Sequence, residues 1–273
     1  MEEKDEIRFS VIITAYNIKD YIEKSIKSVE NQSFKNYELI VVDDCSTDGT
    51  REKLKKYTNI KMIQHEENKC LGGARNSGLK NAKGEYVIFL DGDDYLNNTK
   101  VLEKLNKLID TNMPDVVYLG FEITGKKQGT IIPTPENCTK AYRIAGDRYA
   151  NAWSKCWRRE FLKRNELKFP ENRYYEDVIF IYQAISKAES YMIADFPTHT
   201  YYSGRPNSIT TNVCFKNIHD NLYNIEELME MAKENETEEL NIKIQKEIQR
   251  CKERIDEINN IYKDVRSGKN HAR

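Results

Sequence analysis

The 273-residue sequence predicts an α/β fold, in which helices flank a mostly parallel β-sheet and a charged helical tail follows. Three observations support this fold class. Over the first 120 residues, apolar runs alternate with amphipathic segments, as in repeated β-α-β units. The apolar runs are continuous, which is typical of strands that are buried on both faces. After residue 215, proline is absent and charged residues become frequent, which favours long surface helices.

Each element of the first 120 residues follows from its local pattern. Strands are expected at the apolar runs, and helices where apolar residues recur every three or four positions. In chain order, the predicted strands are 9–14, 38–42, 59–63, 86–90 and 115–119, and the predicted helices are 20–29, 47–57, 73–82 and 99–109.

The pattern weakens between residues 121 and 150, where glycines and prolines predict loops with a short hairpin. Beyond it we expect helices at 152–164 and 176–188 and strands at 191–194 and 198–202. If 152–164 is helical, Trp153 and Trp157 lie one turn apart, either facing the core or offering a surface for a sugar. We therefore divide the chain into a unit of residues 1–215, with halves 1–120 and 121–215, and a tail of residues 216–273.

The tail contains a heptad pattern of apolar residues with alternating spacings of four and three. Such a seam packs either against its own chain or against a second copy, and the spacing leaves a homodimer through the tail open as an alternative. The residues of the seam are Ile244, Ile248, Cys251, Ile255, Ile258, Tyr262 and Val265.

Composition argues against several classes of protein. Lys and Arg number 43 and Asp and Glu number 44, so the chain lacks the excess positive charge of a general nucleic-acid binder. No apolar run approaches the roughly 18 residues of a membrane span, and the acidic N-terminus lacks the apolar region of a signal peptide. The six cysteines are scattered without C-x-x-C spacing, which favours reduced thiols over a zinc site or a disulfide framework. We therefore expect a cytoplasmic protein.

Acidic residues follow two of the predicted strands. Asp43 and Asp44 follow the second strand, and Asp91, Asp93 and Asp94 follow the fourth. Carboxyl ends of parallel strands meet at one edge of a sheet, where ligands bind. Crowded carboxylates repel one another unless a cation neutralises them, and oxygen ligands suit a Mg²⁺-like ion. A D-x-D triplet alone is common in surface loops, but its position after a buried strand favours binding of a metal and a nucleotide.

Two further segments fit this edge of the sheet. Thr14-Ala15-Tyr16-Asn17 ends the first strand, where an aromatic ring and an amide could hold a base. Gly72 and Gly73, with Arg75 beyond them, open a predicted helix. Small residues permit close approach of a ligand, and arginine suits a phosphate or a base carbonyl. The alternative for the glycine pair is a simple tight turn.

Five segments together resemble the inverting family 2 glycosyltransferases with the GT-A fold, a Rossmann-like fold that binds nucleotide sugars. The resemblance covers roughly residues 7–210. It implies that residues 1–120 bind the nucleotide sugar and residues 121–215 the acceptor. The segments are 9–17, 28–33, 41–50, 73–78 and 87–94.

The resemblance also implies roles for individual residues on the donor side. Asp93 would hold the metal, Mn²⁺ or Mg²⁺. Cys45 and Cys70 stand where the family often has glycine. Contacts to the nucleotide sugar fall to Thr14, Tyr16, Asn17, Asp43, Asp44, Asn68, Arg75 and Asp91.

On the acceptor side, residues 174–180 resemble the family's E-D motif. An inverting transfer needs a carboxylate that accepts the proton of the attacking hydroxyl, and this role falls to Asp177, with Glu176 beside it. The alternative is an acidic pair that merely complements a helix dipole. Lys155 lies in a stretch similar to the family's N-K-L-Y-R-R, although a solvated helix lysine is an equal alternative. Arg205 and Ser208 would close over the diphosphate.

The implied function is metal-dependent, inverting transfer of one sugar from a UDP-sugar to a glycan or lipid-linked saccharide, as in polysaccharide biosynthesis. The Q-x-x-R-W motif of processive members is absent, so single-sugar transfer is expected. The location would be cytoplasmic, with peripheral association at the inner face of the membrane left open. A nucleotidyltransferase would need a G-x-G-T-R loop after the first strand, which this chain lacks. The other alternative is an inactive nucleotide-binding scaffold that acts through its helical tail.

Overall fold

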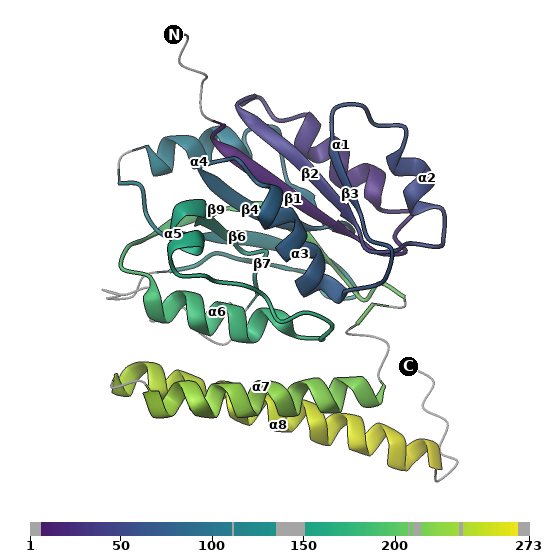
Figure 1. Ribbon diagram of the computed structural model, residues 1–273, viewed down its shortest axis with the longest axis vertical. Coiled ribbons are helices and arrows are strands. Elements are labelled where there is room, and N and C mark those ends of the chain that lie inside the picture. The colour runs from purple at the N-terminus through teal and green to yellow at the C-terminus, as the bar shows by residue number, and fades with distance from the viewer. Residues whose placement is uncertain are drawn as a thin grey trace.

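A computed structural model describes residues 7–110, 112–134, 151–206, 208–209, 214–234 and 237–266. Within these ranges one sheet organises the molecule (Figure 1). Its strands are β1 (Phe9–Ala15), β2 (Tyr37–Asp43), β3 (Lys61–Gln64), β4 (Tyr86–Asp91), β5 (Tyr95–Leu96), β6 (Val116–Gly125), β7 (Gly129–Ile131), β8 (Lys155–Arg158) and β9 (Tyr191–Ser203). Its helices are α1 (Ile22–Glu30), α2 (Thr50–Leu54), α3 (Cys70–Asn81), α4 (Val101–Ile109), α5 (Arg159–Arg164), α6 (Glu176–Lys187), α7 (Phe215–Glu234) and α8 (Glu238–Arg266).

The strands lie in the order β3-β2-β1-β4-β8-β6-β9-β5, and β7 pairs with β6. The first four strands in this order are all parallel, as predicted. β8 then runs antiparallel to both β4 and β6, while β6 and β9 are parallel to each other, so the whole sheet is mixed. Register aligns Ala15 of β1 with Asp43 of β2 and Thr14 with Asp91 of β4, which brings three strand ends to one edge.

Two apolar layers enclose the sheet, because alternate residues of each buried strand face opposite sides. Ile12 of β1 faces the layer that contains α3, α5 and α6, whereas Val11 and Ile13 face α1, α2 and α4. Figure 1 shows α6 covering one face of the sheet, with α7 and α8 beyond it. The predicted pattern of continuous apolar strands therefore reflects burial on both faces.

The predicted helix 152–164 is wrong in its first half. Lys155–Arg158 forms β8, and only Arg159–Arg164 is helical. The segment fills the place between β4 and β6, and this pairing overrides the helical spacing of its aromatic residues. Trp157 is a buried strand residue, while Trp153 stacks on Tyr201 at a centroid distance of 5.3 Å. The two tryptophans are therefore not neighbours on a helix.

Other differences are smaller. The two strands predicted at 191–202 form one strand, β9, with an irregular register opposite residues 119–121 of β6. The helix predicted at 47–57 shortens to α2, because Gly49 precedes it with a left-handed backbone (φ 97°). β6 and β7 form the short hairpin expected after residue 121, and residues 135–150 of that segment lie outside the described ranges.

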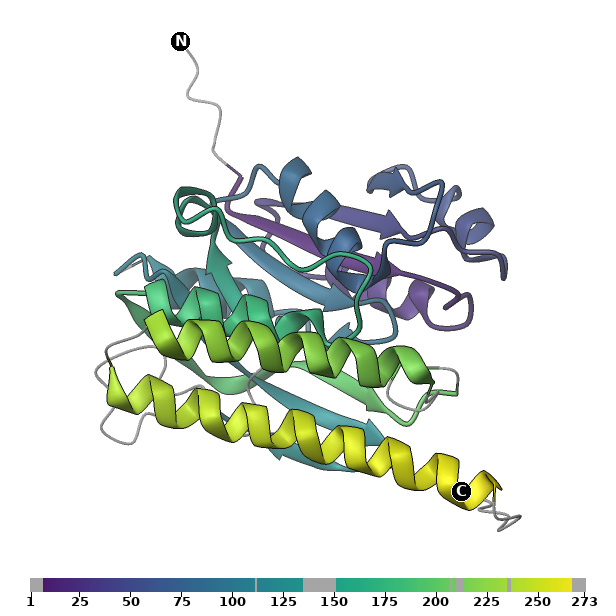
Figure 2. The same ribbon diagram turned by 60° about the horizontal axis from the view of Figure 1, so that its bottom comes forward.

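The tail forms two helices, α7 and α8, that pack beside α6 (Figure 2). Four seam residues of α8 are buried, and two of them, Ile244 and Ile248, join Leu228 of α7 in the core layer of α6. The seam is thus used within the chain, and a dimer through the tail stays a prediction. None of the helices in the described ranges combines the length and apolar character that crossing a bilayer requires.

Candidate active site

Backbone hydrogen bonds join the loops that follow β1, β2 and β4. The amide of Asp44 donates to the carbonyl of Ala15 (2.8 Å), and the amide of Gly92 donates to the carbonyl of Thr14 (3.0 Å). A Cβ atom on Gly92 would lie 2.7 Å from that same Thr14 oxygen, so only glycine fits at this turn. The acidic residues after β2 and β4 are therefore held at one edge of the sheet, as predicted.

Asp43 and Asp44 are buried, and each is fixed by partners. Asp43 accepts a hydrogen bond from the Arg51 Nε (2.7 Å). Asp44 lies 2.7 Å from Nδ1 of His65 and accepts a bond from the amide of Lys69 (2.8 Å). The other ring nitrogen of His65 lies 2.8 Å from the Ser77 hydroxyl, so a polar chain runs from Asp44 into α3.

Arg51, His65 and Ser77 were not among the site residues predicted from the sequence. His65 directly follows β3, so the rule that polar residues after parallel strands belong to the site could have found it. Arg51 and Ser77 sit on helices and carry no such signal. Arg51 and His65 contact the aspartates directly, and Ser77 contacts His65, so all three support the site.

The two predicted asparagines tie together the loops that follow β1, β2 and β3. Asn17 has a left-handed backbone (φ 50°), and its side-chain oxygen accepts a bond from the amide of Thr47 (2.8 Å). Asn68 donates to the carbonyl of Asp44 (3.3 Å) and accepts from the amide of Cys70 (3.1 Å). Tyr16 is 48% exposed, so its ring is available to a ligand.

Cys45 and Cys70 both adopt left-handed backbone conformations, with φ of 66° and 58°. Such angles favour glycine. The left-handed backbone therefore accounts for the glycines that the family often has at these two positions, where this chain has cysteine.

Arg75 joins the two acidic motifs. Its guanidinium is 1% exposed, pairs with Asp91 at 2.8 Å and forms a short ion pair with Glu176. Thr14 donates a long hydrogen bond to the same Asp91 oxygen (3.4 Å). The two carboxylates raise the pKa of Arg75, which keeps its charge despite burial. The residue expected to touch the nucleotide thus lies behind the D-x-D motif, where it links that motif to the E-D motif.

The D-x-D segment forms a turn with two partly exposed carboxylates, those of Asp91 and Asp93. Asp93 pairs with the Nε of Arg205 at 2.6 Å. Asp94 is buried and accepts a bond from the amide of Tyr202 (2.8 Å), while its second oxygen has no hydrogen-bond partner among the described residues. Burial and the charges of Asp93 and Asp91 raise the pKa of Asp94 well above its usual value.

These carboxylates suit a divalent cation. In the part of the chain that the structure describes, no group of three or more His, Cys, Asp or Glu side chains is placed to enclose an ion. A Mg²⁺-type ion that also binds phosphates needs only one or two carboxylates from the protein. Burial and the nearby Asp91 charge raise the pKa of Asp93, so a cation there would relieve an existing repulsion. The donor set therefore fits the predicted metal.

Glu176 and Asp177 begin α6, directly after Tyr175, whose backbone is left-handed (φ 59°). Burial raises the pKa of Glu176 to about 7, although Arg75 opposes the shift. Burial also raises the pKa of Asp177, against the charges of Arg75 and Arg254. A carboxylate with a raised pKa is a stronger base, so the arrangement suits proton transfer near neutral pH.

The remaining predicted residues take different positions. Arg205 joins the site through Asp93, and Ser208 donates its amide to the Arg205 carbonyl (3.3 Å), which closes a turn. Lys155 is fully buried and donates to the carbonyl of Asn151 (2.8 Å). Burial lowers the pKa of Lys155 to about 7. Lys155 is therefore a buried strand residue. It is neither a solvated helix lysine nor a residue at the surface of the site.

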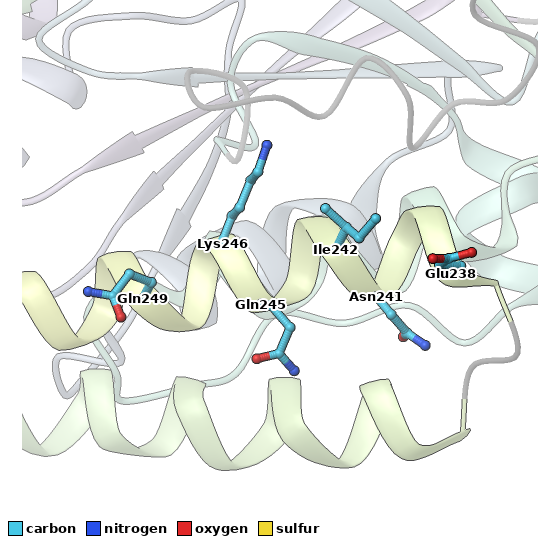
Figure 3. A pocket seen from close by; sticks show the side chains of 6 residues that line it. All are labelled: Glu238, Asn241, Ile242, Gln245, Lys246 and Gln249. Carbon is cyan, nitrogen blue, oxygen red and sulfur yellow. The ribbon is translucent and has the colours of Figure 1, made fainter.

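A separate pocket lies along α8 and contains none of the predicted site residues. Figure 3 shows its lining side chains extending from that single helix. The lining offers amides and one amine but no pair of carboxylates, so it does not compete as a catalytic centre. Its residues are Glu238, Asn241, Ile242, Gln245, Lys246 and Gln249.

Comparison with known proteins gives relatives of one kind. Poly(ribitol-phosphate) beta-N-acetylglucosaminyltransferase TarS of Staphylococcus aureus is 34% identical over 210 residues, which are 73% of this chain and 36% of TarS. The putative teichuronic acid biosynthesis glycosyltransferase TuaG of Bacillus subtilis is 45% identical over 137 residues, 48% of this chain and 54% of TuaG. The chain thus spans about a third and about half of these relatives' lengths.

Solved structures agree with the sequence comparison. The crystal structure of S. aureus TarS 1-349 in complex with UDP-GlcNAc matches with a TM-score of 0.75 at 27% identity, over 90% of this chain and 72% of that chain. This likeness confirms the predicted GT-A fold. The family model described as glycosyl transferase family 2 matches residues 10–182, which is more than half of the sequence. This chain therefore belongs to glycosyl transferase family 2.

Proposed function

We propose that this protein is a metal-dependent, inverting, non-processive glycosyltransferase that moves a single sugar from a UDP-sugar to a glycan or lipid-linked saccharide. The observation that carries the proposal is the buried Arg75, which pairs with both Asp91 and Glu176. The Arg75 guanidinium thus joins the D-x-D motif, proposed to hold the donor, to the E-D motif, which contains the proposed base. The two motifs are therefore placed to act on the same pair of substrates.

On the donor side, Tyr16 offers an exposed ring to the base, and Thr14, Asn17, Asp43, Asp44 and Asn68 shape the loops around the nucleotide. TarS, a relative of known structure, has been crystallised with UDP-GlcNAc and with UDP. This supports a uridine diphosphate donor for the present chain.

Asp93, with Asp91 beside it, would hold Mn²⁺ or Mg²⁺. The cation, when bound, stabilises the negative charge that builds up on the leaving diphosphate. Arg205 is the nearest described cation to Asp93, at 2.6 Å, and with Ser208 in the same turn it is placed to pair with the phosphates. Lys155 makes no direct contact with the donor in this proposal, since its amine is buried.

Asp177 is the general base of the proposal. Its carboxylate takes the proton of the acceptor hydroxyl while that oxygen forms a bond to the anomeric carbon. The bond from this carbon to the diphosphate breaks on the opposite side, so the configuration inverts and an α-linked donor gives a β-linked product. Glu176 orients the neighbouring groups through its pair with Arg75.

The acceptor class follows from the relatives. WfaP of Escherichia coli is a UDP-Glc:alpha-D-GlcNAc-diphosphoundecaprenol beta-1,3-glucosyltransferase. This chain is 44% identical to WfaP over 99 residues, which are 36% of this chain and 39% of WfaP. This supports a lipid-linked saccharide or a surface glycan. A cytoplasmic location, next to the membrane when the acceptor is lipid-linked, belongs to the same proposal. The same proposal assigns donor binding to residues 1–120 and acceptor binding to residues 121–215, and it treats residues 216–273 as a separate helical tail.

Calorimetric titration of UDP with and without Mn²⁺ tests the donor side. We expect binding that strengthens at least tenfold with the metal and that loses this gain in Asp93→Asn, because one metal ligand is removed. Release of UDP from a panel of UDP-sugars, with and without saccharide acceptors, then tests transfer. If the protein binds UDP in a metal-dependent way but transfers no sugar with any donor and acceptor, the proposal of an active glycosyltransferase is contradicted. That result would favour the alternative of an inactive nucleotide-binding scaffold.

A further inference from the structure

The buried face of α7 is polar over its first turns, before the apolar Leu228. Asn217, Asp220, Asn221 and Asn224 recur at helical spacing and are all at most 1% exposed. Burying polar groups costs free energy unless each is hydrogen-bonded, so a helix that only stabilised the fold would present apolar residues here. The nature of this face calls for an explanation beyond stability.

These side chains contact the segment that leads into the E-D motif. Asp220 accepts a hydrogen bond from the amide of Tyr174 (2.9 Å) and pairs with Arg173 (3.3 Å). Lys216 pairs with Asp220 (2.8 Å) and donates to the carbonyl of Asn172. The residues from 172 to 174 are therefore each tied to the first turns of α7.

Tyr175 is held most completely. Its left-handed backbone (φ 59°) is unusual for an aromatic residue. Asn224 donates to its carbonyl (3.1 Å), Asn217 donates to its hydroxyl (2.9 Å), and the guanidinium of Arg254 lies 5.3 Å from the centre of its ring. Three residues of the tail thus over-determine a conformation that the isolated segment would rarely adopt.

Arg254 also connects this turn to Asp177. Glu247 holds Arg254 at 3.3 Å, and Asn221 accepts a hydrogen bond from it (3.4 Å). Arg254 is among the positive charges that act on Asp177. Because Tyr175 immediately precedes α6, its backbone angle sets the direction in which Glu176 and Asp177 leave the turn.

We propose that Asn217, Asp220, Asn224 and Arg254 form a tail clamp that positions Asp177, and that they act as positioning residues for sugar transfer. This inference rests on the proposed function, because it concerns the base of that reaction. Misplacing a reacting group by about 1 Å costs on the order of 100-fold in rate, so a loosened turn should affect turnover strongly.

The test uses four variants of the full chain and one matched control. Asn224→Ala and Asp220→Ala remove clamp contacts, and Asn224→Asp keeps the shape but turns a carboxylate toward the Tyr175 carbonyl. Asp220→Asn keeps one oxygen acceptor for the amide of Tyr174. The control is Leu228→Ala, which removes a buried apolar side chain one turn beyond Asn224 on the same helix and keeps every side-chain hydrogen bond to residues 172–175.

Four measurements are made on each protein: kcat for transfer, UDP affinity with Mn²⁺, hydrogen exchange of a peptide spanning 172–178, and the Tm. In Asn224→Ala, Asn224→Asp and Asp220→Ala we expect kcat to fall about 10- to 100-fold and exchange to accelerate, while UDP affinity stays within about twofold. Asp220→Asn should recover most of the rate. Leu228→Ala should lower the Tm at least as far as Asn224→Ala and keep kcat within about threefold.

The outcomes separate the two proposals. If clamp variants and Leu228→Ala lower kcat equally, or if exchange accelerates while kcat is kept, the tail has no positioning role and the inference fails while the proposed function stands. If the wild-type chain transfers no sugar under any tested condition, the proposed function fails and the inference fails with it.

Discussion

We call the edge of the sheet at the ends of β1, β2 and β4 the donor edge, because it carries the residues proposed to bind the nucleotide sugar. The donor edge and the tail clamp hold their polar groups by different means. At the donor edge, Asp43 and Asp91 follow apolar strands, and the register of the sheet fixes them. At the clamp, Asn217, Asp220 and Asn224 bond residues that lie 42 to 49 positions earlier in the chain. In our proposals the sheet supplies the donor-side groups, whereas α7 and α8 hold the turn that precedes Asp177 at the start of α6. Each prediction below tests one side of this contrast.

The largest effect is expected at Asp177, where the two regions meet. Asp177→Asn removes the proton acceptor but keeps the shape of the turn, so kcat should fall by about 10³-fold. UDP affinity should be unchanged, because the donor edge is intact. Steady-state transfer assays and calorimetry measure the two quantities, and Glu160→Gln, an exposed change on α5, serves as the control. Residual transfer above a tenth of the wild-type rate would assign the base elsewhere.

The next effect concerns Arg75, which links the two motifs. Arg75→Gln leaves Glu176 and Asp91 without their buried cation, which should lower the free energy of unfolding by about 3–5 kcal/mol. The loss should be smaller at pH 5.5 than at pH 8, because Glu176, with a pKa of about 7, is protonated at the lower pH. Urea denaturation at both pH values tests this. Lys27→Gln, which breaks an exposed ion pair, should change little at either pH, and an equal loss in both variants would refute the bridge.

A smaller effect is expected from the buried Lys155. Its pKa of about 7 in the folded chain lies below its usual 10.5, so between these values the unfolded chain binds a proton that the folded chain does not. The free energy of unfolding should therefore rise with pH in this window, by about 2 kcal/mol from pH 7 to pH 9 relative to Lys155→Met. Parallel slopes for the two proteins would show that Lys155 is charged in the folded state.

The smallest effect is expected at Tyr16, the exposed ring of the donor edge. Tyr16→Ala should weaken UDP binding about fivefold, because stacking on a base contributes roughly 1 kcal/mol, and kcat at saturating donor should be kept. Tyr16→Phe should bind like the wild type, since it keeps the ring. A loss of kcat without a loss of affinity would remove Tyr16 from the nucleotide side.

The sequence was sufficient for the elements whose signal is local. Continuous apolar runs identified β1, β2 and β4, and the acidic residues at the ends of β2 and β4 meet at one edge of the sheet, as expected for parallel strands. β8 was missed, because Lys155–Arg158 becomes a strand only through pairing with β4 and β6. The clamp was missed for a related reason. Its buried amides look like an ordinary polar helix face until the segment that they bond is known.

The contacts from α7 and α8 to the turn at Tyr175, which precedes Asp177, have a consequence for biosynthesis. Chains emerge from the ribosome N-terminus first, and their parts fold as they become available. The strands that carry Asp43 and Asp91 emerge long before Arg254, which lies on α8, the last helix described. With the roles proposed above, a chain nicked before α8 would keep its donor-side residues but lose the contacts that hold the turn before Asp177, and would bind a donor without transferring its sugar.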